Sequence, residues 1–203
     1  MRQRLVVALM VLLIPALLRA DPITIVDTGP GPSTLPGFSL GGLQWVAVEF
    51  PVTKPTVITA AQGWMIVSRG GFLDLALYRG GGNVPRDVLF RSTGRIESGN
   101  ADWRGLSTLT WPVTRGAYWI GFEVPGPDPM SGALPFPSER PLRNGAVVDR
   151  ESSESTYQEA NAVAQMGLRI FGEATAAPTP EPASILLLAT GLAGFLLRRQ
   201  WLQ

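Results

Sequence analysis

The strongest constraint on the fold is the alternation of apolar and polar residues in short runs bounded by Gly and Pro. Residues 42–50, for example, place Val46, Val48 and Phe50 on one side of an extended chain. The same alternation recurs in residues 56–59, 64–68, 72–78, 88–91, 108–114, 117–124 and 166–170. A period of two residues indicates a half-buried strand, and the whole pattern predicts about nine strands. We therefore expect an all-β domain with two antiparallel sheets, packed as a β-sandwich or jelly roll.

Two segments lack this alternation. Residues 152–164 are the only helix-like passage, and their small polar residues favour a loop equally. Residues 125–141 contain six prolines, which cannot donate the hydrogen bonds of a central strand. We expect residues 125–141 to form a long, exposed loop.

Composition excludes several kinds of chemistry. The chain has no Cys and no His, so it has no thiolate nucleophile, disulfide, imidazole base or zinc site built on those residues. Residues 21–177 contain 12 basic and 15 acidic residues, a net charge of −3. A nucleic-acid partner is not expected, because neutralising phosphates requires clustered Lys and Arg.

The N-terminus has the pattern of a secretory signal peptide. Arg2 and Arg4 precede an uninterrupted apolar stretch at 5–18, which is too short to span a bilayer comfortably. The first acidic residue, Asp21, follows the small residue Ala20, so we place signal cleavage between Ala20 and Asp21. The alternative is a retained N-terminal anchor.

Near the C-terminus, a loose linker at 173–179 leads into Pro180, Glu181 and Pro182. The two prolines keep this tripeptide extended, because Pro fixes its own φ and moves the preceding residue out of the helical region. An extended segment is what a protease-like active site binds.

An uncharged segment at 183–197 follows and ends at Arg198 and Arg199. As a straight helix its 15 residues would rise about 22 Å, so local thinning and snorkelling would have to cover a hydrocarbon core of roughly 30 Å. The two arginines remain cytoplasmic, which places the large domain on the outer side of the inner membrane.

The order of these three C-terminal parts, over residues 180–203, resembles the PEP-CTERM sorting signal. That resemblance implies recognition by an exosortase, which cuts near the tripeptide and transfers the protein to the cell surface or extracellular matrix. It also implies a Gram-negative host that makes exopolysaccharide. An ordinary single-span tail is the alternative.

The central part is similar to a domain found upstream of such signals in secreted bacterial proteins of unknown activity. The similarity rests on residues 56–59 with Gly63 and Trp64, and on residues 75–78, 101–106 and 116–123. It supports the β-sandwich and implies no catalytic residue and no ligand.

Carboxylates are the remaining candidates for hydrolytic chemistry, because a pair of them could form a glycosidase site. The candidates are Asp74, Asp102, Glu123, Asp128 and Asp149. Asp74 and Glu123 alternate with the apolar residues of their strands, so we expect both to be solvated.

Calcium would take oxygen ligands from loops such as 100–102, Asp128 or 149–151, but no Asp-x-Asp-x-Asp-Gly spacing occurs. The three glycines at 80–82 precede no helix and indicate a turn. No metal and no cofactor is therefore expected.

Aromatic residues are the candidates for ligand contact, since exposed rings stack on sugar faces. Trp45, Trp111 and Tyr118 are in register with apolar neighbours and are expected in the core. Trp103 lies between Asp102 and Arg104, and Trp119 is out of phase with its neighbours, so these two tryptophans are the candidate surface contacts.

The sequence thus predicts a signal peptide at 1–20, a β-sandwich at 21–172, a linker at 173–179 and a sorting signal at 180–203. We expect a secreted, non-enzymatic protein of the surface or matrix that is associated with exopolysaccharide or biofilm. The alternative is a carbohydrate-binding module that recognises the exopolysaccharide. An extracellular hydrolase would need a carboxylate pair that the sequence does not display.

Overall fold

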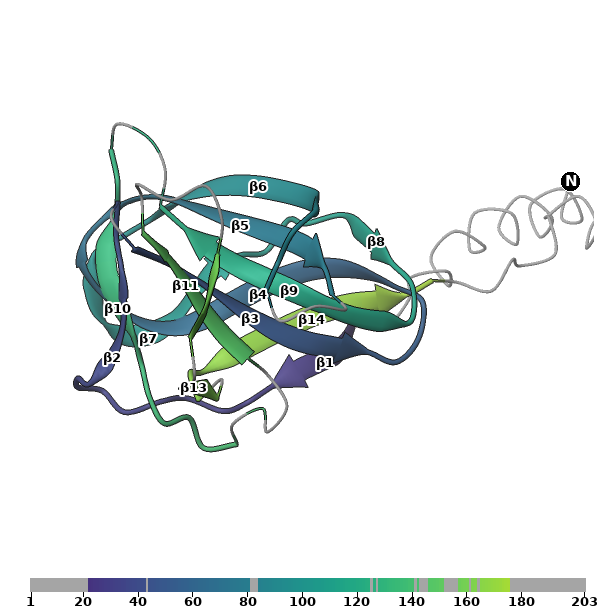
Figure 1. Ribbon diagram of the computed structural model, residues 1–203, viewed down its shortest axis with the longest axis horizontal. Helices are drawn as coiled ribbons and strands as arrows, with labels where there is room; N and C mark the ends of the chain where they lie inside the picture. Colours follow the sequence, from purple (N-terminus) through teal and green to yellow (C-terminus); the bar gives the residue numbers. More distant parts are fainter. Residues whose placement is uncertain are drawn as a thin grey trace, which may run out of the picture.

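The computed structural model describes residues 22–42, 44–80, 84–124, 126, 128–140, 142, 146–151, 157–160, 162–163 and 165–175, and it places fourteen strands and no helix among them. Sheet A contains β1 (Pro22–Asp27), β14 (Leu168–Ala174), β4 (Thr56–Arg69), β10 (Ser131–Pro135), β2 (Gly37–Leu40), β7 (Gly99–Leu106) and β8 (Trp111–Val113). Sheet B contains β12 (Gln158–Ala160), β11 (Ala146–Glu151), β3 (Gln44–Val52), β9 (Gly116–Glu123), β5 (Gly71–Arg79), β6 (Val88–Ile96) and β13 (Ala162–Val163). The two sheets form the two layers of a sandwich (Figure 1), which confirms the predicted all-β sandwich.

Sheet A is organised around β4, a strand of 14 residues. Along one edge, β4 pairs first with β14 and then with β10. Along the other edge, it pairs with β8 near Thr56 and with β7 from Ala61 onward. The two short alternating runs in the sequence, 56–59 and 64–68, are therefore parts of one continuous strand.

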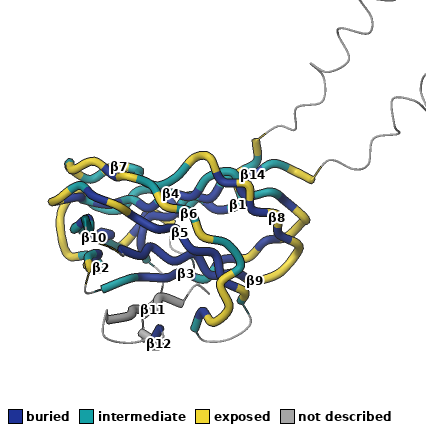
Figure 2. Tube along the Cα trace, turned by 90° about the horizontal axis from the view of Figure 1, so that it is seen from above, coloured by how far each residue is buried: buried dark blue, intermediate teal, exposed yellow. Residues whose placement is uncertain are grey.

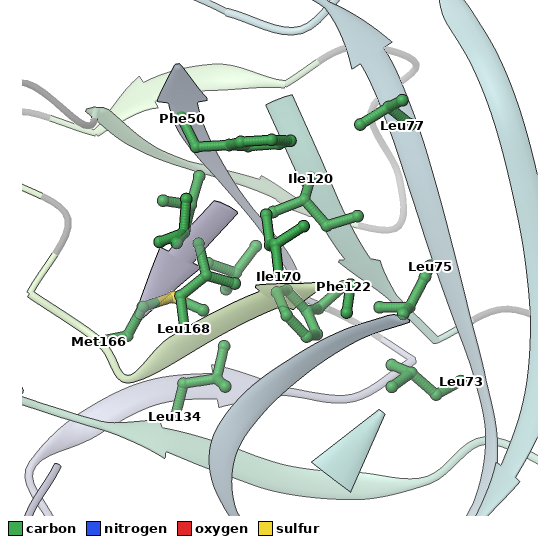
Figure 3. Close-up of a cluster of buried hydrophobic side chains, with 14 of the residues drawn as sticks. Phe50, Leu73, Leu75, Leu77, Ile120, Phe122, Leu134, Met166, Leu168 and Ile170 are labelled. Atoms are coloured by element: carbon green, nitrogen blue, oxygen red, sulfur yellow. The ribbon is translucent and has the colours of Figure 1, made fainter. Parts of the chain in front are cut away.

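The core lies between the inner faces of the two sheets (Figure 3). Sheet B contributes the leucines of β5 together with Ile120 and Phe122 of β9, and sheet A contributes Leu168 and Ile170 of β14. Each of these side chains is at most 1% exposed. Gly63 of β4 also faces this core, where a Cβ atom would lie 2.8 Å from Leu134 Cδ2 and 3.1 Å from Phe122 Cε1. The missing side chain at Gly63 therefore lets the two layers approach closely.

Most of the faces predicted from alternation agree with the structure. In each of the runs 42–50, 72–78, 108–114, 117–124 and 166–170, the alternating apolar residues of one face are buried in this cluster. Trp111 and Tyr118 are buried as expected, and Trp45 is partly buried. The alternation did not reveal β1, β2, β7 and β11, which contain Pro, Gly or polar residues at positions where a regular strand would be apolar.

The expectation that residues 125–141 form a long exposed loop is wrong. Within that range, β10 lies between β4 and β2 and pairs with both. Met130 and Leu134 are fully buried, with 0% exposure. Pro129 precedes this strand and Pro135 is its last residue, so residues 131–134 retain the N–H groups that a central strand needs.

The helical option for residues 152–164 is also wrong where the structure describes them. Residues 158–160 and 162–163 form β12 and β13, which both pair with β11. At the other boundary, β14 continues through Glu173 to Ala174, past the expected end of the domain at residue 172. Pairing with a strand already in place can supply backbone hydrogen bonds that local composition does not predict.

The described chain begins and ends at the same end of the sandwich, because Pro22 of β1 pairs with Glu173 of β14. Figure 2 shows this end beside β8, with its exposed turns in yellow. The described residues do not include the predicted signal peptide at 1–20, its predicted cleavage site or residues 176–203. Within the part that is described, no helix is long and apolar enough to cross a membrane.

Replacing Phe122 with Ala should lower the free energy of unfolding by about 3–5 kcal/mol, because the ring is completely enclosed between the sheets. Urea denaturation followed by tryptophan fluorescence measures this loss. Val88→Ala is the control, since Val88 is 47% exposed and its truncation should change stability by about 0.5 kcal/mol or less. A loss below about 1 kcal/mol for Phe122→Ala would contradict this description of the core.

Candidate functional site

Two of the predicted carboxylates lie side by side on sheet B. Asp74 of β5 and Glu123 of β9 are direct cross-strand partners. Both point to the face of the sheet opposite the main core, as their alternation indicates. Asp74 is 5% exposed and Glu123 is 0% exposed. The expectation that both acids are solvated is therefore wrong.

The outer face of sheet B is covered, and this is why the acids are buried. Ala47, Ala76 and Tyr78 of the sheet pack with Trp119 and with Tyr157, which precedes β12, in a second apolar cluster. Tyr157 meets Tyr78 edge-on, with ring centroids 5.7 Å apart. Because Tyr157 lies far along the chain from β5 and β9, no local pattern reveals this cover.

Glu123 is surrounded by donors. Its Oε1 accepts hydrogen bonds from the hydroxyls of Tyr78 and Tyr157, the latter at 2.8 Å. Its Oε2 lies 2.7 Å from Nη1 of Arg91, which reaches over from β6. A buried carboxylate is tolerable when charge and hydrogen bonds compensate its lost hydration, and here both do so.

Arg91 joins the two acids. Its Nη1 is also 3.1 Å from Oδ2 of Asp74, whose other oxygen accepts a 2.6 Å hydrogen bond from the hydroxyl of Thr93. The Arg91 side chain is 38% exposed, so it connects the buried acids with solvent. We call Asp74, Tyr78, Arg91, Glu123 and Tyr157 the buried acid cluster.

Gly121 makes this arrangement possible. A Cβ atom at Gly121 would lie 2.9 Å from the hydroxyl oxygen of Tyr157 and 3.2 Å from Glu123 Oε1. It would also lie 3.2 Å from Cε2 of Tyr78. Any side chain at this position would compete with the hydroxyls for the space beside the carboxylate.

The surroundings of the cluster shift the tyrosine pKa values. Burial raises the pKa of Tyr78 well above its ordinary value, and the hydrogen bond to Glu123 and the charge of that residue raise it further. Burial and the Glu123 charge likewise raise the pKa of Tyr157. Burial alone would lower the pKa of Arg91, but the charge of Glu123 and the bond to Asp74 raise it overall. Both tyrosines are thus held neutral and donate to Glu123 across the physiological pH range.

A hydrolytic role requires carboxyl groups that reach a substrate or a water molecule. Oε1 of Glu123 accepts two hydrogen bonds, and Oε2 lies in an ion pair with Arg91 without a hydrogen-bond partner among the described residues. The side chain of Glu123 has no exposed surface. Both oxygens of Asp74 are engaged as well. In this arrangement the buried acid cluster joins strands β5, β6 and β9 to the segment that carries Tyr157.

The two tryptophans expected at the surface differ. Trp119 is 0% exposed and belongs to the apolar cluster under Tyr157, so the expectation of a surface position for Trp119 is wrong. Trp119 is out of phase with the residues of the main core because it packs in the second apolar cluster, on the other face of sheet B. Its Nε1 has no hydrogen-bond partner among the described residues.

Trp103 is partly exposed on the outer face of sheet A. It is the cross-strand partner of Trp64 of β4, and the two rings meet edge-on at 5.5 Å. The guanidinium carbon of Arg169 from β14 lies 4.0 Å from the Trp103 ring centroid, a cation–π distance. These three residues form an aromatic and cationic surface, which we call the Trp103 surface.

Asp27 of β1 holds Arg169 in place, with Oδ1 3.3 Å from its Nε. Burial by itself would raise the pKa of Asp27, but the 2.9 Å hydrogen bond from Gly29 N–H and the contact with Arg169 lower it overall. The negative charge of Asp27 therefore persists to low pH and keeps Arg169 against Trp103.

The remaining acids do not come together. Asp128 pairs with Arg69 and Arg95 at the end of the sandwich remote from the termini, and Asp102 accepts a 2.8 Å hydrogen bond from the N–H of Trp103. The structure does not describe the side chains of Asp149 and Glu151. It also does not describe Gly81 and Gly82 of the predicted glycine turn. Among the residues described, no group of three potential metal ligands occurs.

Comparison with known proteins identifies the C-terminus. A model of the PEP-CTERM protein-sorting motif matches residues 178–200, which confirms the resemblance of Pro180, Glu181 and Pro182 with the following segment to that signal. No curated protein matches the chain. The motif indicates a protein that an exosortase sorts to the cell surface or extracellular space of a Gram-negative bacterium. The similarity of the central segments to a domain upstream of such signals stays a prediction.

The motif residues themselves, including Arg198 and Arg199, lie outside the described part of the chain, as do Ala20 and Asp21. Their individual roles stay predictions.

The buried tyrosines should make stability fall with rising pH. Below the ordinary tyrosine pKa of 10.0, Tyr157 is protonated in both the folded and the unfolded chain. Above it, the unfolded chain releases this proton while the folded chain retains it, so the free energy of unfolding should fall by up to about 1.4 kcal/mol per pH unit for each such tyrosine. Denaturation of wild type and Tyr157→Phe between pH 9 and pH 11 measures the difference in slope, which should be shallower in the variant.

At neutral pH, Tyr157→Phe should cost about 1.5–3 kcal/mol, because it removes a hydrogen bond to a buried carboxylate. The matched control is Tyr118→Phe. The Tyr118 hydroxyl donates to the neutral carbonyl of Thr114 at 3.1 Å, so its loss should cost about 0.5–1.5 kcal/mol. Equal costs for the two variants would show that the hydrogen bond from Tyr157 to Glu123 is no stronger than one to a backbone carbonyl.

Proposed function

We propose that this protein is a non-enzymatic component of the cell surface or extracellular matrix that is associated with exopolysaccharide and biofilm. The single observation that carries the proposal is the PEP-CTERM motif at residues 178–200 behind a β-sandwich. The motif supplies the route to the surface, and the sandwich supplies a compact domain that stays there. Stability of the domain rests on burial between its sheets, since the chain has no Cys for disulfides.

The absence of enzymatic activity is part of the proposal, and the buried acid cluster supports it. Asp74 and Glu123 are a cross-strand carboxylate pair, which is the arrangement that a glycosidase would need. Their oxygens are occupied by Arg91, Thr93 and the two tyrosines. A substrate would have to displace partners that offset the burial of two charges, which is costly.

In the precursor, the apolar segment at 183–197 would hold the protein in the inner membrane, with Arg198 and Arg199 on the cytoplasmic side. The exosortase would then cut near Pro180, Glu181 and Pro182 and release the domain from this anchor. Under this proposal the tripeptide is needed for release and is irrelevant to insertion.

The variant Pro180→Ala/Glu181→Ala/Pro182→Ala tests this step in the native host. The variant should accumulate in the inner membrane at full C-terminal length, because apolar length and flanking charge alone fix a helix in a bilayer. Wild type should be found outside the inner membrane with a C-terminus near residues 180–182. Cell fractionation and intact-mass measurement distinguish the two forms.

Thr175→Ala is the matched control for that experiment, since it changes the linker but leaves the tripeptide intact. It should behave as wild type. Wild-type protein that retains Gln203 in the inner membrane, and that cannot be told apart from the triple variant, would refute sorting.

The alternative function is carbohydrate binding, and the Trp103 surface favours it. A partly exposed indole beside a guanidinium offers an apolar ring and hydrogen-bond donors together. This combination suits a sugar, which has an apolar face and hydroxyl edges.

Glycan arrays that include the host's own exopolysaccharide test this alternative. If the Trp103 surface binds sugar, Trp103→Ala should weaken binding at least about tenfold, which corresponds to about 1.4 kcal/mol. Phe72→Ala is the control, because Phe72 is 41% exposed and lies on β5 of the other sheet. Equal binding by both variants would exclude the Trp103 surface, and turnover of a glycoside substrate panel would contradict the non-enzymatic role.

A further inference from the structure

The end of the sandwich from which both termini leave also carries three turns. We call it the tail end. Val52 of β3 pairs with Gly116 of β9, and Thr56 of β4 pairs with both Val113 of β8 and Ala174 of β14. The turns at 53–55 and 114–115 therefore lie beside the last residues of β14. Arg79 pairs with Tyr118 of β9 and its N–H donates to the carbonyl of Asp87, which places the end of β5 and the start of the chain into β6 at the same end.

The tail end is cationic although residues 21–177 carry a net negative charge. Its described turns and strand ends present the exposed cations Lys54, Arg79, Arg86 and Arg115. The acids there are Asp87 and Glu173. None of the four cations forms an ion pair with another residue that the structure describes.

The opposite end of the sandwich is different. There Arg69 and Arg95 both pair with Asp128, at 3.4 Å and 3.2 Å, and Arg95 lies 3.7 Å from Glu97. Among the described residues, Lys54, Arg79, Arg86 and Arg115 form no ion pair. Arg104, near the opposite end, also lacks a carboxylate partner there, but its guanidinium donates to the backbone carbonyls of Glu97 and Asn100. We therefore take the four exposed cations of the tail end as the charge that a partner can meet.

A cavity opens at the tail end between the edges of the two sheets. Its volume is about 490 Å³, and it is lined by Leu89, Phe90, Val113 and Tyr118, with Arg79 and Arg115 among its polar residues. Phe90 stacks on Trp111 with an angle of 11° between the rings, which gives the cavity a firm apolar wall. Two cations beside an apolar wall suit a group that carries negative charge on an apolar stem.

The tail end is also tied to the membrane in the precursor. Residues 176–182 separate Thr175 from the apolar segment at 183–197, and seven extended residues span at most about 25 Å. A domain held this close experiences a high effective concentration of the membrane surface, so weak contacts suffice to orient it.

From these observations we propose that the tail end binds anionic phospholipid headgroups of the outer leaflet of the inner membrane while the precursor is anchored. Lys54, Arg79 and Arg115 contact the lipid phosphates, and the domain stands with its termini toward the bilayer. This inference rests on the membrane-inserted precursor of the proposed function. It adds a specific surface and a specific partner, and it fixes the orientation in which the sorting motif is presented.

The chain provides its own probe, because Lys54 is its only lysine. The test uses the chain from Asp21 to Gln203, inserted through its C-terminal segment into nanodiscs of phosphatidylcholine with or without phosphatidylglycerol. An amine-reactive acetylating reagent is added, and the modification of Lys54 is followed over time by peptide mass spectrometry. Acetylation should be about fivefold slower or more in the discs with phosphatidylglycerol, and about 0.5 M salt should abolish the difference.

Two double variants distinguish lipid binding by the tail end from closeness to the membrane that the anchor alone imposes. Arg79→Glu/Arg115→Glu should lose the protection of Lys54, because it reverses the charge beside the cavity and leaves the tether intact. Arg69→Glu/Arg95→Glu makes the same change in charge at the opposite end and should keep the protection. Tryptophan fluorescence verifies that both variants are folded, which is expected because all four side chains are at the surface.

Several outcomes overturn the proposal. Equal acetylation in both kinds of disc, or protection that survives Arg79→Glu/Arg115→Glu, shows that the tail end does not bind the lipid. Protection of Lys54 by inorganic phosphate in phosphatidylcholine discs shows a site for the free anion instead. A chain that inserts normally but lacks protection refutes this inference alone, whereas a chain that fails to insert refutes the anchored precursor as well.

Discussion

The pairing of β4 along both of its edges is the constraint on which most of the structure depends. Its first residue, Thr56, pairs with Val113 on one side and Ala174 on the other, which brings the C-terminal strand to the tail end. Further along, its outward side chain Trp64 faces Trp103 of β7, and its inward neighbours Gly63 and Met65 face the core. A strand bonded on both edges has no free backbone groups for most of its length, so its register positions everything attached to it.

The buried acid cluster shows how charge can fix a covering segment. Moving Glu123 out of water is costly unless charge and hydrogen bonds replace its hydration, and Arg91, Tyr78 and Tyr157 supply them together. Tyr157 directly precedes β12, at the opposite edge of sheet B from β6. Its hydrogen bond to the carboxylate therefore specifies where that segment packs and also stabilises it there. Gly121 has no side chain, and this leaves the space in which the Tyr157 hydroxyl meets Glu123. The result is a second core, polar and aromatic, on the outer face of sheet B, which would otherwise be exposed to solvent.

The position of the termini connects the fold to the sorting route. Since β1 and β14 are neighbours and antiparallel, the described chain enters and leaves at one end, and the PEP-CTERM motif follows a short distance beyond it. Lys54, Arg79, Arg86 and Arg115 at that end form no ion pair with the residues that the structure describes, whereas Arg69 and Arg95 at the other end are paired with Asp128. Four exposed cations thus lie at the end of the domain from which the sorting motif follows. Under the proposal above, this end faces the membrane before release.

The sequence by itself determined the class of the fold, the inward faces of the main strands and the sorting signal. The alternation within each strand and the order of the three parts of the sorting signal are local patterns. They can therefore be recognised without knowing which segments pair in the fold. The sequence could not assign β10 (Ser131–Pro135), because the hydrogen bonds that β4 and β2 provide on either side outweigh the prolines before it and at its end. The sequence also could not predict the burial of Glu123 and Trp119. A period of two indicates which face of the sheet a residue occupies, but not whether that face is exposed to solvent. Only the tertiary structure decided this, because burial there depends on Tyr157, a residue distant in sequence whose hydroxyl supplies the hydrogen bond that water would otherwise give.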